Sequence, residues 1–361
     1  MFIIRRHNIL FKYFFKMNKQ LYNKQNKKDL IENLNNEDFK RITLSFYKYI
    51  KIINPLQFRD KLYSDFIDMN ILGRVYIAAE GINAQMSIPD YNESKLKTYI
   101  NSLSILKDVK FKNAVQEGIS FYKLTIKIKN EIVAYKLNTD QYDMDNIGCH
   151  LDPVEFNKAI EDPNSILVDI RNHYESEIGH FKGALVPDVE RSQELLPEVK
   201  KLLEGKEDKK ILLYCTGGIR CEKASSYLIK NNYKDVNQLD GGVINYAHQV
   251  KMKKIKSKYF GKNFVFDDRL GERITQDDIS KCHQCNNKSD SHKNCSNHLC
   301  HLLFIQCQNC DSIFSGCCSQ ECADYNKLTE EEKACKKKSF LIYNEKRLKG
   351  KVKPKLYKII G

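Results

Sequence analysis

The chain has 361 residues, which is enough for two or three domains that each bury a hydrophobic core. Its formal net charge is +14, and much of the excess lies in residues 336–361, which contain ten Lys or Arg and one acid, Glu345. Such a basic tail fits either a polyphosphate partner or a solvated, disordered end. No apolar run approaches the roughly twenty residues that span a bilayer, so no membrane-spanning helix is expected.

Residues 41–145 alternate between strand and helix periodicity. The expected elements are, in order, a strand at 42–50, a helix at 58–69, two strands within 73–88 that turn at Glu80–Gly81, a helix at 92–106 and a strand at 121–130. The order βαββαβ predicts a ferredoxin-like (acylphosphatase-like) α+β sandwich. Lys123, Lys127 and Lys129 make one face of the last strand basic, although such stripes are commonly just the solvent side of a strand. Nothing in this section resembles a catalytic site.

Residues 146–255 contain short apolar runs, ILVDI, ILLYC and VNQLD, that alternate with helical segments. Strands that are almost continuously apolar are buried on both faces, so we expect a parallel sheet with helices on each side. The helices are expected at 153–160, 193–204, 221–231 and 243–250. The functional crevice of such a sheet lies at the carboxyl ends of its strands, and Cys215 is at one of these ends.

The stretch YCTGGIRC connects the strand that ends at Tyr214 to a helix that starts near Cys221. Its glycines permit a tight turn, so the loop amides are expected to converge on the Cys215 sulfur. A helix N-terminus and the nearby arginine favour the thiolate, which is the nucleophilic form of cysteine. We therefore predict that Cys215 is catalytic, with a buried structural thiol as the alternative. The predicted active-site loop is Thr216, Gly217, Gly218, Ile219, Arg220 and Cys221.

The number of residues between Cys215 and Arg220 distinguishes between two classes of enzyme that have such a loop. Phosphatases of the cysteine type have a longer loop between Cys and Arg than the four residues found here, whereas the shorter loop resembles that of rhodanese domains. LVDIRNHYESEIGHFKGA resembles the opening rhodanese motif, and LDGGVINYA resembles its closing Gly-Gly turn. Tyr246 stands where this turn usually has tryptophan, and we expect it to be a packing substitution. The matching positions of the opening motif are Asp169, Arg171, Glu175, Gly179, His180 and Gly183, of which Asp169 and His180 are expected to be structural.

Several long motifs occur together and in order between about residue 41 and about residue 347. They include GRVYIAAEGINAQ, CTGGIRCEKA and GKNFVFDDRLGERI, and together they resemble the bacterial rhodanese-related tRNA uridine hydroxylases. The resemblance implies oxygen-dependent conversion of uridine to 5-hydroxyuridine at wobble position 34 of tRNA, with Cys215 as the active cysteine. It also implies molecular oxygen as a co-substrate and the tRNA anticodon loop as a partner. We expect no nucleotide cofactor.

Two mechanisms are open for Cys215: addition to C6 of the uracil ring, or a persulfide or oxidised cysteine with Cys221 as a resolving thiol. Two other functions are also open, a persulfide sulfurtransferase and a non-catalytic, zinc-containing adaptor that binds RNA. The basic tail and the run KMKKIKSKYFGK (251–262) are the expected contacts to the RNA backbone.

Ten of the thirteen cysteines lie after residue 281, and the pairs CHQC and CQNC have the spacing of zinc-ribbon sites. We expect structural zinc, with an oxygen-activating iron site as the alternative, and no disulfides in a reducing cytoplasm. The primary candidate ligands are Cys282, Cys285, Cys307 and Cys310, and further candidates are Cys295, Cys300, Cys317, Cys318, Cys322, His283, His292, His298 and His301.

The resulting organisation is a multidomain α/β protein. Its expected sections are an N-terminal extension at 1–40, whose order stays open, the ferredoxin-like domain at 41–145, the rhodanese domain at 146–255, the Cys-rich module at 256–330 and the basic tail at 331–361. The start, MFIIRRHNILFKYFF, lacks an apolar core followed by a small-residue cleavage site, so no secretory signal is expected.

Overall fold

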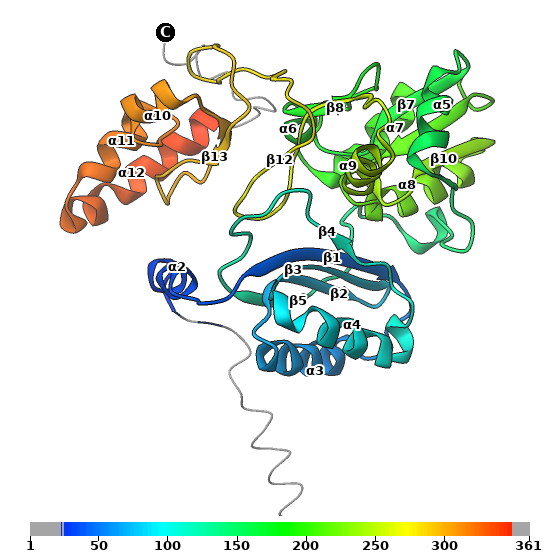
Figure 1. The fold of residues 1–361 in the computed structure, drawn as a ribbon. Coiled ribbons are helices and arrows are strands. Elements are labelled where there is room, and N and C mark those ends of the chain that lie inside the picture. Colours follow the sequence, from blue (N-terminus) through cyan, green and yellow to red (C-terminus); the bar gives the residue numbers. More distant parts are fainter. Residues whose placement is uncertain (1–22, 24, 349–361) are drawn as a thin grey trace, which may run out of the picture. The chain divides into compact units, whose positions relative to one another are not determined.

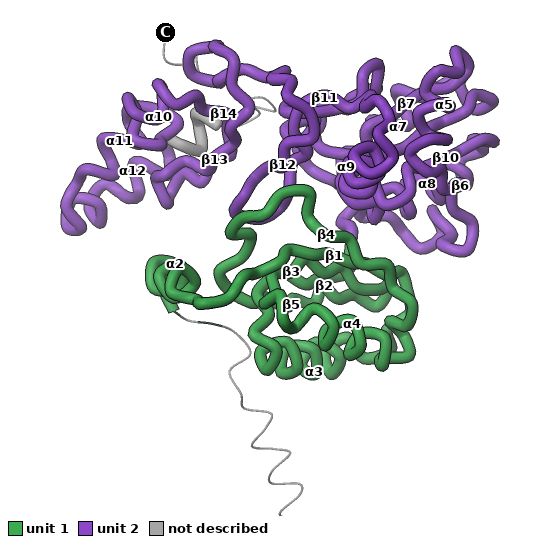
Figure 2. Tube along the Cα trace, in the orientation of Figure 1, with its two compact units in different colours: residues 1–132 green, residues 133–361 purple. Residues whose placement is uncertain are grey.

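The computed structural model describes residue 23 and residues 25–348, with side chains up to residue 342. The chain forms two compact units, residues 1–132 and 133–361 (Figure 2). Residues 1–22, 24 and 349–361 are outside the described part of the chain. The predictions made for most of the N-terminal extension and for the end of the basic tail therefore lie outside the described residues. No helix in the described part of the chain is long and apolar enough to cross a membrane.

Unit 1 is a five-stranded sheet in the order β4-β1-β3-β2-β5, with α3 and α4 against one of its faces (Figure 1). The elements are α2 (Lys27–Asn35), β1 (Arg41–Tyr49), α3 (Pro55–Asp68), β2 (Leu72–Ala78), β3 (Gly81–Pro89), α4 (Glu93–Ser102), β4 (Lys112–Asn113) and β5 (Leu124–Ile128). The short α2 lies within the predicted N-terminal extension, and its N-cap Asn26 accepts a hydrogen bond from Asp29 N.

Local chemistry explains the boundaries in unit 1. Asn54 caps α3 by accepting a hydrogen bond from Gln57 N at 3.0 Å, and Pro55 occupies the first turn. Between β2 and β3 the chain turns at Gly81, where a Cβ would lie 2.2 Å from Lys48 O. Only glycine fits this position, as the sequence analysis expected for the turn.

The first four strands confirm the predicted ferredoxin-like sandwich, since β4, β1, β3 and β2 are neighbours and each pair is antiparallel. The strand predicted at 121–130 is not the fourth strand of this motif. It forms β5, which pairs parallel with β2 at the opposite edge of the sheet. The fourth strand is β4, whose two residues are too few to show an alternating pattern.

The first half of unit 2 contains a four-stranded parallel sheet in the order β6-β10-β9-β7. Its elements are β6 (Cys149–Leu151), α5 (Pro153–Glu161), β7 (Ser165–Asp169), α6 (His173–Ser176), α7 (Ser192–Leu202), β9 (Lys210–Tyr214), α8 (Ile219–Lys230), β10 (Asp235–Leu239) and α9 (Gly242–Lys253). Ile211 and Leu213 of β9 face the cluster that includes α7 and α8, whereas Leu212 and Tyr214 face the cluster that includes α5 and α9. The predicted sheet with helices on both faces is therefore confirmed.

A buried ion pair fixes the end of β7. Arg171 and Asp169 are both fully buried, and the guanidinium donates to both carboxylate oxygens at 2.8 and 2.7 Å. Arg171 also donates to Gly179 O at 2.7 Å, and Asp169 accepts from the Tyr214 hydroxyl at 2.7 Å. His180 contacts Ser176 O at 2.8 Å through Nδ1. Asp169 and His180 thus connect the first strands to their neighbours, as the sequence analysis expected.

The remaining elements of unit 2 are two strands that pair with each other, β8 (Gly179–Phe181) and β11 (Tyr259–Asn263), and the elements of the segment that follows them. The elements of that segment are β12 (Glu272–Arg273), β13 (His292–Asn294), β14 (Leu303–Ile305), α10 (Gln308–Phe314), α11 (Gln320–Lys327) and α12 (Glu330–Leu348). The described part of the predicted basic tail is therefore helical, with Phe340 packed on Tyr325 at a ring distance of 4.5 Å.

Candidate active site at the Cys215 loop

Cys215 lies directly after β9, at the carboxyl end of the parallel sheet, and its side chain is fully buried. Its sulfur accepts a hydrogen bond from Gly218 N at 3.1 Å. Gly218 has a φ of 96°, which favours glycine, and α8 begins at the next residue. The loop amides and the N-terminus of α8 therefore converge on the sulfur, as the spacing predicted.

The closing Gly-Gly turn holds the loop from the other side. Val243 N donates to Cys215 O at 3.0 Å, and Ile244 N donates to Thr216 O at 3.1 Å. Gly242 has a φ of 67°, and a Cβ at this position would lie 2.5 Å from Cys215 O. The start of α9 can approach the loop this closely only because residue 242 is glycine.

Arg220 is buried beside Cys215 and is held by a carboxylate. Its two terminal nitrogens donate to the two oxygens of Glu175 at 2.6 and 2.8 Å, and one of them also donates to Thr216 Oγ1 at 3.2 Å. Glu175 is fully buried on α6 and also accepts from Asn172 N at 3.1 Å. The paired arginine places a fixed positive charge next to the sulfur.

The electrostatics of the loop stabilise the Cys215 thiolate. Burial alone would raise the pKa of Cys215, but a hydrogen bond from the Cys221 thiol, the Arg220 charge and two backbone N–H groups lower it to about 6. Burial and the neighbouring Cys215 raise the pKa of Cys221 well above its usual value. At neutral pH the first cysteine is therefore mainly a thiolate, and the second is a neutral thiol that donates to it.

The residues that sequence reasoning missed are those that hold the loop in place. Glu175 was recognised only as a motif position, and its bidentate contact to Arg220 has no local sequence signal. Tyr135, far upstream in the chain, is buried and donates its hydroxyl to Arg220 O at 3.1 Å. Phe266 lies in the motif GKNFVFDDRLGERI, and its ring is 5.7 Å from the Arg220 guanidinium. In the sequence, only the length of this motif indicated that the segment contributes to the site in addition to linking two elements.

Tyr246, which stands where tryptophan was expected, is fully buried on α9. Its ring packs against Phe181 at 4.8 Å, and its hydroxyl donates to Asn157 Oδ1 at 2.8 Å and accepts from Lys258 N. The packing role proposed for it agrees with these contacts.

The cysteines after residue 281 gather into two sets of four. Within each set, the four sulfurs lie within 4.8 Å of one another. Neighbouring sulfurs such as Cys285 and Cys307, or Cys300 and Cys318, are 3.6 Å apart, close to the about 3.8 Å that tetrahedral metal–sulfur bonds of about 2.3 Å would give. Both sets could hold a metal ion. The first contains Cys282, Cys285, Cys307 and Cys310, and the second contains Cys295, Cys300, Cys318 and Cys322.

The other candidates for metal binding are outside these sets. Cys317 is fully buried next to Cys318, but its sulfur accepts from Asn326 Nδ2 at 3.5 Å. His283 lies between the first two cysteines, where its Nε2 contacts Glu177 at 2.9 Å. Within the described residues neither set includes a histidine, although His292, His298 and His301 lie in the same section.

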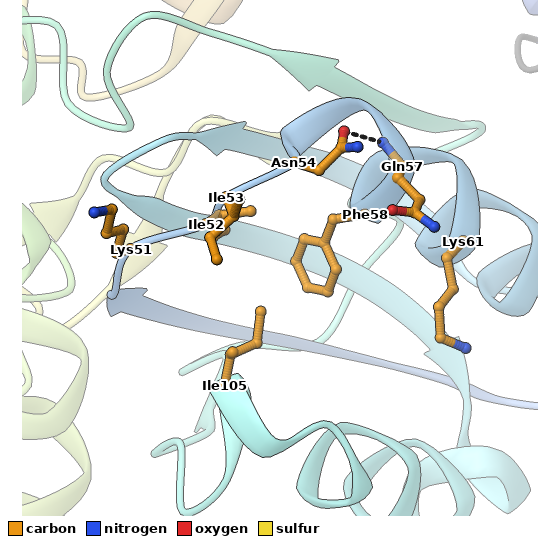
Figure 3. A pocket seen from close by; sticks show the side chains of 8 residues that line it. All are labelled: Lys51, Ile52, Ile53, Asn54, Gln57, Phe58, Lys61 and Ile105. Atoms are coloured by element: carbon orange, nitrogen blue, oxygen red, sulfur yellow. Dashed lines mark hydrogen bonds between the residues drawn. The ribbon is translucent and has the colours of Figure 1, made fainter.

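Unit 1 has a cavity of about 300 Å³ at the start of α3, where the side chain of Asn54 is already used to cap the helix (Figure 3). Lys51 and Lys61 are its charged lining residues, and the lining contains no Cys, His, Asp or Glu. This cavity offers no thiol, imidazole or carboxylate and no paired acid and base, so Cys215 is the stronger candidate site.

Comparison with known proteins covers almost the whole chain. A protein from Leptospira interrogans named "tRNA uridine(34) hydroxylase" is 50% identical over 337 residues, which is 93% of this chain and 92% of that protein. Proteins of the same name from Photorhabdus laumondii and Yersinia pestis are 43% and 44% identical, over 88% and 86% of this chain and 91% and 88% of their own. The chain belongs to the tRNA uridine(34) hydroxylase family.

The domain matches agree with this membership. Residues 41–132 match the family described as UPF0176 acylphosphatase like domain, and residues 152–249 match Rhodanese-like domain. Residues 260–323 match Rhodanase C-terminal and include both cysteine sets. In this member of the tRNA uridine(34) hydroxylase family, the Cys215 loop lies entirely within the rhodanese-like match.

The thiol of Cys221 gives a test of the electrostatics of the site. Replacing Cys221→Ala removes the hydrogen bond to Cys215, so we expect the pKa of Cys215 to rise from about 6 by roughly one unit. Cys221→Ser keeps a donor of similar size and should change the pKa less. The pH dependence of alkylation of the Cys215 peptide, followed by mass spectrometry, measures both. An equal pKa in wild type and Cys221→Ala would show that Cys221 does not stabilise the thiolate.

Proposed function

We propose that this protein hydroxylates uridine 34 of tRNA to 5-hydroxyuridine, with Cys215 as the nucleophile and molecular oxygen as the oxidant. The observation that carries the proposal is the geometry of the buried Cys215 sulfur, which accepts a hydrogen bond from a loop amide and lies beside the Arg220 charge, an arrangement that lowers its pKa to about 6. Relatives of similar length at up to 50% identity carry the name of this activity. A thiolate that is already formed at neutral pH is the group that nucleophilic catalysis requires.

The first step is addition of Cys215 to the pyrimidine ring. The thiolate lone pair forms a bond to C6, and the electrons of the C5–C6 double bond move onto C5 and O4 as an enolate. C5, which is a poor nucleophile in free uridine, becomes electron-rich in this adduct. The Arg220 charge is engaged with Glu175, so its role is to hold the thiolate rather than to reach the base.

Oxygen then reacts at C5 of the adduct. Formation of the C5–O bond and protonation give a C5 hydroperoxide, and an external two-electron donor reduces its O–O bond to a hydroxyl and water. Loss of the C5 proton with cleavage of the C6–S bond restores the double bond and the Cys215 thiolate. One oxygen atom enters the base and the other leaves as water, so each turnover consumes two electrons and two protons.

The substrate base has to reach a buried sulfur, which favours an unpaired nucleotide. Wobble uridine lies in the anticodon loop, where a base can be splayed out at limited cost. On the protein side, a Cβ added at Gly217 would meet nothing within 4 Å, so the space over the loop is open at this residue. We propose that U34 enters over Gly217.

Basic residues near the 251–262 run provide contacts for the RNA backbone in this proposal. Lys158, Lys182, Lys256 and Lys258 line a cavity of about 590 Å³ beside α5, together with the ring of Phe260. Glu161 also lines it and forms an ion pair with Lys258 at 2.6 Å. Three lysines therefore remain to contact phosphates.

We further propose that both cysteine sets bind structural zinc. Four thiolates complete a tetrahedral site and leave no ligand position for a substrate, which is typical of structural rather than catalytic zinc. None of the thirteen cysteines, all of which lie in the part of the chain that the structure describes, forms a disulfide, which together with a tRNA substrate fits a reducing cytoplasm.

Nucleoside analysis of tRNA tests the activity. We expect cells that lack this protein to lose 5-hydroxyuridine and its derivatives, and wild-type protein to restore them. Cys215→Ser should restore less than 1% of the wild-type level, because serine is not ionised at neutral pH. Cys149→Ser is the matched control, since Cys149 is exposed and should restore full modification. Unchanged 5-hydroxyuridine in the deletion, with thiolated nucleosides lost instead, would favour the sulfurtransferase.

Two adjacent buried cysteines test the metal assignment. Cys318 belongs to the second set, whereas Cys317 belongs to neither. Purified wild-type protein is expected to contain two zinc ions per chain, Cys318→Ser about one, and Cys317→Ser two. Elemental analysis by mass spectrometry measures the content. Stoichiometric iron, or equal zinc in both variants, would contradict structural zinc at these sets.

A further inference from the structure

The sheet of unit 1 has one face that neither α3 nor α4 covers (Figure 1). Leu44 and Phe46 of β1 point into the core with these helices. Because neighbouring residues of a strand point to opposite faces, Ser45 and Tyr47 point to the helix-free face. The same alternation places Tyr76 there, between the buried Val75 and Ile77.

The strand register aligns these side chains in a row. Tyr47 pairs with Asn83, Asn83 pairs with Tyr76, and Tyr76 pairs with Lys127. Neighbouring strands are about 4.8 Å apart, so the two tyrosines flank Asn83 at a separation of about 10 Å. In the next row, Ser45 pairs with Gln85 and Gln85 with Arg74. We call this set of residues the tyrosine face: Ser45, Tyr47, Arg74, Tyr76, Asn83, Gln85 and Lys127.

The tyrosine face has a single sign of charge. None of the five strands contains Asp or Glu, and Arg74 and Lys127 are exposed. Two further lysines lie beside the rings, with Lys112 Nζ 4.3 Å from the centre of the Tyr47 ring and Lys129 Nζ 5.3 Å from that of Tyr76. Aromatic rings with adjacent ammonium groups suit a chain of stacked bases and phosphates.

Two polar side chains of the tyrosine face can form hydrogen bonds with the edges of bases. Asn83 and Gln85 are partly buried on the central strand, and each amide offers both donors and an acceptor to a base. The segment between β4 and β5 closes one end of the face, where Ser120 Oγ lies 2.6 Å from Thr43 Oγ1. No His, Cys, Asp or Glu lies on the tyrosine face, so it is suited to binding and not to catalysis.

We propose that the tyrosine face is a binding platform for single-stranded RNA, on which Tyr47 and Tyr76 stack unpaired nucleotides of the anticodon loop. Sheets that bind single-stranded RNA use aromatic side chains on a helix-free face in this way. Arg74, Lys112 and Lys127 contact the phosphates. The proposal rests on the proposed function in one respect, the identity of the RNA.

Binding of an RNA stem–loop with the anticodon arm sequence tests the platform. The full chain with Cys215→Ser avoids turnover during the measurement. On this background we expect Tyr47→Ala and Tyr76→Ala each to weaken binding about tenfold, which is the loss expected for one stacked base. Tyr47→Phe and Tyr76→Phe keep the rings and should bind within about twofold of the parent. Lys127→Gln should reduce the slope of log affinity against log salt by about one.

Matched controls lie elsewhere on unit 1. Tyr91 is 62% exposed outside the sheet, and Lys95 is exposed on α4, so Tyr91→Ala and Lys95→Gln should leave affinity and salt slope unchanged. Equal affinity of the tyrosine variants and their parent would overturn the platform. Loss of binding in Tyr→Ala and Tyr→Phe alike would also overturn it, because the ring would not be the binding element.

Photocrosslinking of wild-type protein gives a measurement that does not depend on the folding of variants. A 4-thiouridine in the loop of the same RNA should crosslink to peptides that contain Tyr47 or Tyr76, and crosslinks confined to unit 2 would overturn the proposal. The experiments distinguish a failure of the proposed hydroxylation from a failure of the proposed RNA-binding platform. Binding through the tyrosines without formation of 5-hydroxyuridine would contradict the activity alone, whereas hydroxylation with unaffected tyrosine variants would contradict the platform alone.

Discussion

The buried pair of Arg220 and Glu175 is the interaction on which the conformation of the Cys215 loop depends. Each of the two carboxylate oxygens accepts from one terminal nitrogen of the guanidinium, and this connects α6 to the start of α8. Removing one partner of such a pair leaves a buried charge and costs about 3–5 kcal/mol. The pair also keeps a positive charge beside Cys215, where it counteracts the effect of burial on the thiol pKa. A fully buried sulfur can therefore be ionised at neutral pH.

The Cys215 loop is supported by elements that lie far apart in the sequence. The rhodanese-like sheet holds the thiolate, the Gly-Gly turn at Gly242 supports the loop, and Phe266 of the segment after β11 lies against Arg220. Under the proposed zinc assignment, the two cysteine sets add metal binding to the small buried cluster around Phe304 and Tyr325, since small modules with limited apolar burial commonly use metal ions. In the proposed division of labour, unit 1 binds RNA and unit 2 performs the chemistry.

Much of this organisation could be predicted from the sequence because its signals are local. The apolar strands predicted the parallel sheet, and the position of Cys215 at the end of a strand indicated the candidate site. The position of β5 could not be predicted, because the alternation of Leu124 and Ile126 identifies a strand but not the edge that it joins. Likewise, the CxxC spacing identified the first cysteine set, but only the fold shows that Cys318 joins a second set and Cys317 does not. The Arg220–Glu175 pair joins residues 45 positions apart and has no local pattern.

The central claim is that Cys215 adds to C6 of uridine 34, and hydrogen exchange at C5 tests it most directly. Reversible addition makes C5 an enolate carbon that takes up a proton from solvent. Incubated in D2O without oxygen, wild-type protein should therefore place one deuterium at C5 of U34, and Cys215→Ser should place none. Absence of exchange in a preparation that hydroxylates the same tRNA once oxygen is admitted would contradict the account and point to an oxidised or persulfide form of Cys215.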